Sequence, residues 1–141
     1  MKRVLKWIVI VLVVVFVAIQ FVPVDRENPL GGKPFVAPPA VMAMTKRSCF
    51  DCHSNETVWP WYAYIAPVSW LVAHDVEEGR RKVNLSLFAD MSDQKRAAKA
   101  DEMAEEAEQG EMPPAQYLLM HSDAKLSAED VKALRTWADG L

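Results

Sequence analysis

The sequence predicts an all-α domain that follows a long apolar helix, and three observations support this fold class. The run from Trp7 to Ile19 contains no polar residue. The segments beyond residue 40 repeat apolar side chains at helical spacing. No segment alternates polar and apolar residues as a half-buried strand would. At 141 residues, the chain has room for one small domain with accessory segments.

The first predicted element is a transmembrane anchor over residues 1–24. Apolar residues dominate from Val4 to Val24, and a helix of that length spans about 30 Å, the thickness of a bilayer's hydrocarbon core. The three basic residues of this element place its N-terminal side in the cytoplasm: Lys2, Arg3 and Lys6. We therefore expect a single-pass anchor in the cytoplasmic membrane, with the rest of the chain on the periplasmic side. A cleaved signal peptide is the alternative, but residues 20–24 lack the small residues of a cleavage site.

A proline-rich tether is predicted next, over residues 25–39. Five prolines lie between Pro23 and Pro39, with Gly31 and Gly32 among them. Proline prevents regular helix and central strand, so the segment is expected to be extended and semi-rigid. Its expected role is to hold the following domain away from the membrane.

Residues 40–141 form the predicted domain, and its helices follow from local signals. Residues 40–52 contain few breakers, and residues 67–83 carry an apolar stripe of Val68, Leu71, Val72, Val76 and Val83. Ser92 can cap a helix that runs to Gln109 and stops at Gly110. A short helical turn follows Pro113 and Pro114. Ser127 and Asp130 resemble a capping box for a last helix, whose buried face is expected to comprise Val131, Leu134, Trp137 and Ala138.

The charge balance argues against a nucleic-acid partner. The net charge of the whole chain is −3. Because three of the 16 bases precede the apolar run, the remainder carries 13 bases against 19 acids, a net charge of −6. Phosphates would be repelled by such a surface.

The motif that carries chemistry is C-x-x-C-H, from Cys49 through Cys52 to His53. On a helix, residues three apart share one side, so both sulfurs can reach one flat ligand. The pattern is typical of c-type haem attachment, in which two thiols form thioethers and the histidine binds iron. It therefore predicts one covalent haem c in a small cytochrome c-like domain. Three alternatives remain: a thioredoxin-like redox pair, a zinc site completed by another histidine, and a structural disulfide.

The expected sixth ligand of the iron is Met112. It lies between Gly110 and Pro113-Pro114, in a loop that the prolines stiffen. His74 and His121 are the other candidates. The remaining methionines are set aside because they lie in apolar runs, near the motif helix, or on an acidic helix.

The stretches CFDCHSNETVWPWYAYIAPVSW and GEMPPAQYLLMHSDAKLSAED resemble the small bacterial haem-binding domain proteins, which are anchored or exported and carry one C-x-x-C-H motif. The resemblance covers about residues 30–141. It implies that Cys49 and Cys52 attach haem, that His53 is the proximal ligand and that Met112 is the distal one.

The expected function is electron transfer to an unidentified redox partner protein, and whether the protein is also an enzyme is left open. A five-coordinate haem enzyme or gas sensor, with His74 or His121 beside the iron, is one alternative. A zinc-stabilised interaction module on the membrane surface is another.

Two further groups of residues each have more than one possible role. The bases Arg80, Arg81 and Lys82 pair with haem propionates or a partner, or are merely solvated. The aromatic group forms a haem wall, a docking face or ordinary core: Trp59, Trp61, Tyr62, Tyr64 and Trp70.

Overall fold

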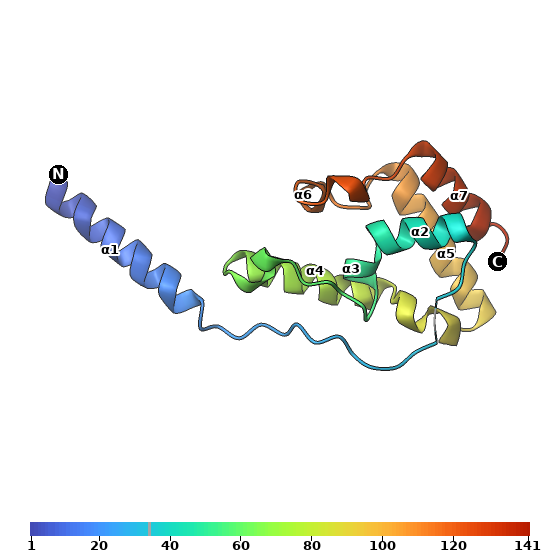
Figure 1. Cartoon of the computed structure of the whole chain (residues 1–141), viewed down its shortest axis with the longest axis horizontal. Coiled ribbons are helices and arrows are strands. Elements are labelled where there is room, and N and C mark those ends of the chain that lie inside the picture. The colour runs from blue at the N-terminus through green and yellow to red at the C-terminus, as the bar shows by residue number, and fades with distance from the viewer. Residues whose placement is uncertain (34) are drawn as a thin grey trace.

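The computed structural model describes residues 1–33 and 35–141, and within them it is all-α. Seven α-helices and three short 3₁₀ helices follow one another, with no strand among the described residues. Figure 1 shows α1 (Lys2–Ile19) extending away from the other helices and joined to them by a long extended segment. The all-α prediction is therefore confirmed.

The helix caps form where local chemistry predicts them. Helix α5 (Asp93–Gln109) begins after Ser92, whose hydroxyl accepts a hydrogen bond from the backbone of Lys95, and it ends at Gly110 with φ of +74°. Helix α7 (Ala128–Ala138) begins with a reciprocal capping box between Ser127 and Asp130. Helix α6 (Ala115–Leu118) follows Pro114.

The helix predicted over residues 40–52 is divided by a break at Cys49. Helix α2 (Pro39–Ser48) ends there, and helix α3 (Phe50–His53) begins immediately afterwards. The φ of Cys49 is −125°, outside the helical range. The break turns the short motif helix toward α4 (Val68–Lys82), which it contacts.

The helix predicted over residues 67–83 is present as α4, but the first half of its apolar stripe is not buried. Val76 and Val83 are buried, whereas Val68 and Leu71 are 42% and 50% exposed. The reason is that the start of α4 extends beyond the main bundle (Figure 1) and packs against η1, the 3₁₀ helix Trp61–Tyr64. Helical periodicity indicates an apolar face without indicating what covers it.

The hydrophobic core lies where α2, α5 and α7 meet η2, the 3₁₀ helix Leu85–Asp90. The Phe35 ring packs edge-to-face against Phe50, Phe88 and Trp137, with centroid distances of 5.5 to 6.1 Å. Phe88 and Trp137 also contact each other in a tilted arrangement at 5.7 Å. Leu134 and Ala138 are buried, and Val131 and Trp137 are partly buried against the core, so the predicted inner face of α7 is confirmed.

The extended segment before α2 is held against the domain at several of its described residues. The Arg80 guanidinium donates hydrogen bonds to the Glu27 carbonyl and the Asn28 side chain at 2.9 and 2.7 Å. Arg26 Nε donates to the Ala63 carbonyl at 2.8 Å. Farther along, Phe35 enters the core. Residues expected to act only as a tether therefore contribute to the fold.

The segment expected to be a transmembrane helix corresponds to α1. Its apolar side chains are exposed along the helix. Across residues 1–33 and 35–141, no helix is both long enough and apolar enough to cross a membrane.

Candidate haem site

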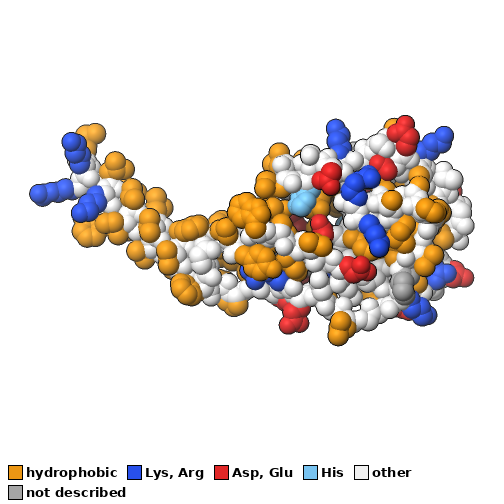
Figure 2. Space-filling model, viewed as in Figure 1, with side chains coloured by type: hydrophobic (Ala, Val, Ile, Leu, Met, Phe, Trp, Pro, Cys, Tyr) orange, Lys and Arg blue, Asp and Glu red, His pale blue; other side chains and the backbone are white. Residues whose placement is uncertain are grey.

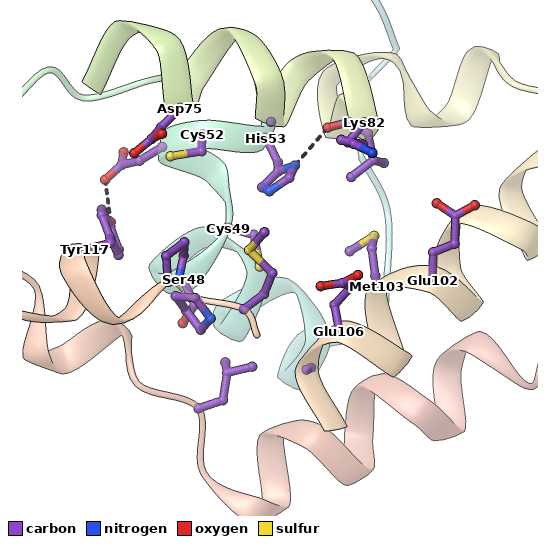
Figure 3. Close-up of a pocket in the computed structure, with 18 of the residues that line it drawn as sticks. Ser48, Cys49, Cys52, His53, Asp75, Lys82, Glu102, Met103, Glu106 and Tyr117 are labelled. Carbon is purple, nitrogen blue, oxygen red and sulfur yellow. Dashed lines mark hydrogen bonds between the residues drawn. The ribbon is translucent and has the colours of Figure 1, made fainter. Parts of the chain in front are cut away.

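A cavity of about 450 Å³ lies between α3, α4, α5 and the loop that precedes α6 (Figure 3). This volume lies in the range of small-molecule and cofactor sites. The structure brings together in its wall the four predicted site residues: Cys49, Cys52, His53 and Met112. Residues from separate parts of the sequence therefore meet at one site.

His53 is oriented by the backbone of Val83, the residue that follows α4. Its Nδ1 lies 3.1 Å from the carbonyl oxygen of Val83, an interaction drawn in Figure 3. Nδ1–H can donate there, which leaves the Nε2 lone pair available to a metal; histidine ligands are commonly held in this way. Burial lowers the pKa of His53, opposed by backbone hydrogen bonds with Val83 and Gly79. The neutral imidazole required for iron ligation is therefore favoured.

Cys49 and Cys52 are free thiols that line the cavity. Burial raises the pKa of Cys49 to about 12, with a further contribution from Cys52. Burial also raises the pKa of Cys52 to about 12, reinforced by Asp75 and Asp51. Redox-active cysteine pairs have a lowered pKa, so the environment does not favour a thioredoxin-like role. Among the described residues, no three His, Cys, Asp or Glu side chains are grouped to hold a metal ion.

Gly79 allows α3 and α4 to approach closely at the motif. A Cβ atom at this position would lie 2.5 Å from the carbonyl oxygen of Cys52 and 3.0 Å from its carbonyl carbon. Real Cβ atoms do not come so close to backbone. Because Val83 directly follows the last residue of α4, this close contact also positions the carbonyl that orients His53.

Charged side chains surround the cavity. Six acids line it: Asp51, Asp75, Glu78, Glu102, Glu105 and Glu106. Lys82 and Lys99 are the bases in the same lining. Of the three bases at the end of α4, Lys82 lines the cavity, whereas Arg80 holds the extended segment and Arg81 pairs with Glu78. Lys82 is thus placed to meet a carboxylate of a bound cofactor, whereas Lys99 is ion-paired with Glu102 of the same lining.

Tyr117 connects the motif to His121, which Tyr62 contacts from η1. Tyr117 Oη donates to Asp51 Oδ2 at 2.9 Å, and its ring stacks on His121 at a centroid distance of 4.3 Å. His121 Nε2 lies 2.6 Å from Tyr62 Oη. His121 is therefore engaged outside the cavity lining, and His74 is exposed on α4. Tyr117 lines the cavity, and sequence reasoning did not identify it.

Met103 is a second methionine in the cavity wall (Figure 3), also missed by sequence reasoning. The sequence alone argues against Met103 as an iron ligand, because α5 is acidic. A signal was present, because Met103 lies three residues after Ala100 and four before Ala107, which are both buried. That spacing places it on the inner face of α5.

The Tyr117→Phe variant tests whether the contact with Asp51 supports the site. We expect the free energy of unfolding to fall by about 1.5–3 kcal/mol, because a hydrogen bond to a charged acceptor is lost. Tyr64→Phe is the matched control, since its exposed ring stacks with Arg26 and keeps that contact. Chemical denaturation followed by circular dichroism measures both variants. Equal losses in the two would show that the bond to Asp51 contributes nothing specific.

The fold and the cavity together define a small helical domain built to hold a haem-type cofactor. The chain belongs to the haem-binding domain family, whose model matches residues 14–140. No curated protein and no solved structure matches the chain.

Proposed function

We propose that this haem-binding protein is a c-type cytochrome that transfers electrons. In this proposal Cys49 and Cys52 hold one haem c through thioethers, His53 is the proximal ligand and Met112 the distal one. The observation that carries the proposal is the hydrogen bond from His53 to Val83, which leaves Nε2 available in a cavity lined by both thiols. A haem held there supplies an iron that gains and loses one electron.

The lining of the cavity supports the binding of such a cofactor through its apolar side chains and through one base. Val83, Met103 and Leu134 provide apolar surface, which excludes water from the site. Lys82 supplies a cation for a propionate group, whereas Lys99 is ion-paired with Glu102. Filling both axial positions with His53 and Met112 favours electron transfer over substrate binding.

An enzyme or gas sensor needs an open position beside the iron and a distal group to act there. His74 is exposed on α4, and His121 is bonded to Tyr62 and stacked on Tyr117. Neither histidine belongs to the cavity lining. These positions support the electron carrier over the five-coordinate alternative.

We further propose that α1 attaches the protein to the cytoplasmic membrane, with the haem domain on the periplasmic side. The exposed apolar side chains between Trp7 and Ile19 support attachment to lipid. The basic residues at the N-terminal end, Lys2, Arg3 and Lys6, support a cytoplasmic start. Haem attachment on the exported side agrees with this orientation.

The test is to produce the full chain together with haem-attachment machinery and to measure covalent haem. We expect one haem per chain by the pyridine haemochrome spectrum, and haem staining that survives a denaturing gel. The Cys49→Ala/Cys52→Ala variant should lose the stain. Circular dichroism of this variant checks that its helices persist. A wild-type protein without covalent haem, or one that contains zinc, contradicts the proposal.

A further inference from the structure

One exposed segment of the domain is free of charge. Residues 57–73 contain no Asp, Glu, Lys, Arg or His, although 25% of the whole chain is Asp, Glu, Lys or Arg. They form η1 and the first part of α4, the half of that helix that extends beyond the bundle. An uncharged run of this length usually indicates burial, so its position on the surface requires an explanation.

Several large side chains of this segment point outward, whereas Trp59 and Tyr62 are half-buried. Trp61 is 69% exposed and Tyr64 is 59% exposed. We call the exposed set the aromatic face, and it comprises Val58, Trp61, Tyr64, Ile65, Val68, Trp70 and Leu71. Leu119 and Met120 lie nearby, because His121 is bonded to Tyr62 of η1. Extended exposed apolar surfaces mark sites of interaction.

The aromatic face continues directly from α1. The Gln20 side chain, just after α1, exchanges hydrogen bonds with both the backbone N–H and the carbonyl of Ala66, at 2.9 and 3.2 Å. Arg26 lies over the ring of Tyr64 at 4.6 Å. In Figure 1 the start of α4 faces the end of α1, and in Figure 2 apolar side chains run from α1 onto this end of the domain.

We propose that the aromatic face lies in the interfacial layer of the same lipid bilayer to which α1 attaches. Trp and Tyr are enriched at this depth, where a ring is buried and its polar group stays hydrated. None of the side chains that make up the face is itself charged, so none opposes insertion by its desolvation, although the Arg26 guanidinium lies over the ring of Tyr64. Its continuity with α1 favours lipid over a second copy or a partner protein. The inference rests on the membrane attachment proposed above.

The proposal limits how far the haem cavity can lie from the membrane. Helix α4 runs from Val68 in the aromatic face to Gly79 in the cavity wall. Eleven residues at about 1.5 Å each separate them by about 17 Å along the helix. The cavity is thereby held close to the membrane instead of moving on a free tether.

Photocrosslinking in the full-length holoprotein tests this placement. Separate variants carry p-benzoylphenylalanine in place of Trp61, Val68, Val13 and Lys132, in vesicles of phosphatidylethanolamine and phosphatidylglycerol. Val13 reports on α1, and Lys132 is an exposed control on α7. After illumination, mass spectrometry should find an added phospholipid at positions 61, 68 and 13. We expect no lipid adduct at position 132.

The outcomes separate this inference from the proposed attachment. Lipid adducts at position 13 without any at 61 or 68 overturn the placement of the aromatic face and leave the attachment intact. Covalent dimers at 61 or 68 identify a second copy as the occupant and also overturn it. Absence of lipid at position 13 overturns the attachment and this inference together.

Discussion

The Gly79→Ala substitution is expected to lower the free energy of unfolding by about 1–3 kcal/mol, the usual cost of overpacking. The added Cβ would lie 2.5 Å from the carbonyl oxygen of Cys52. Because this neighbour is backbone, no side-chain rotation can relieve the contact, and α3 and α4 must move apart. Alanine's better helix propensity, about 1 kcal/mol, offsets part of the cost. Denaturation followed by circular dichroism measures the effect.

The same variant should also hold haem poorly, because separating α3 from α4 displaces Cys52 and moves His53 from the Val83 carbonyl. Haem content per chain is the second measurement. Gly140→Ala is the matched control, since its Cβ would lie 3.5 Å from the Trp137 carbonyl, an ordinary contact. We expect the control to change stability by no more than about 0.5 kcal/mol. A Gly79→Ala protein with wild-type stability and haem content would show that the close approach is not required.

The parts of the fold that were predicted correctly depend on local chemistry. Ser92 caps α5 and Gly110 ends it because a hydroxyl acceptor and a left-handed residue act on the nearest helical turn. The capping box of Ser127 and Asp130 likewise needs only four consecutive residues. The cysteine motif is equally compact, so its residues could be identified together.

The parts that were missed depend on contacts between distant segments. Nothing near Gly79 in the sequence shows that Cys52 will pack against it. Arg80 lies in a run of bases typical of a solvated helix end, yet it donates hydrogen bonds to Glu27 and Asn28. Phe35 lies among prolines and still enters the core. Each of these roles depends on contact with a residue that is distant in the sequence and close only in the folded chain.

Two methionines in one cavity make the sixth ligand the most informative test of the site. Met103 packs against the hydrophobic core from α5, the usual position of a methionine that fills space. Met112 is 40% exposed and belongs to a loop anchored by bonds from its own N–H and that of Glu111 to the Glu106 carbonyl. The backbone of Met112 is fixed by these bonds, while its side chain is not part of the hydrophobic core. This combination suits a thioether ligand. Met112 is therefore the better candidate.

Met112→Leu is expected to abolish the low-spin, six-coordinate spectrum and to lower the reduction potential by more than about 100 mV, because axial ligands strongly set the potential of haem iron. Leucine removes the sulfur and keeps the apolar volume, so loss of packing does not explain the change. Met103→Leu is the matched control and should leave both properties close to those of the wild type. If Met103→Leu changes the spectrum and Met112→Leu does not, the ligand comes from α5. If neither does, the sixth ligand is not a methionine of this cavity.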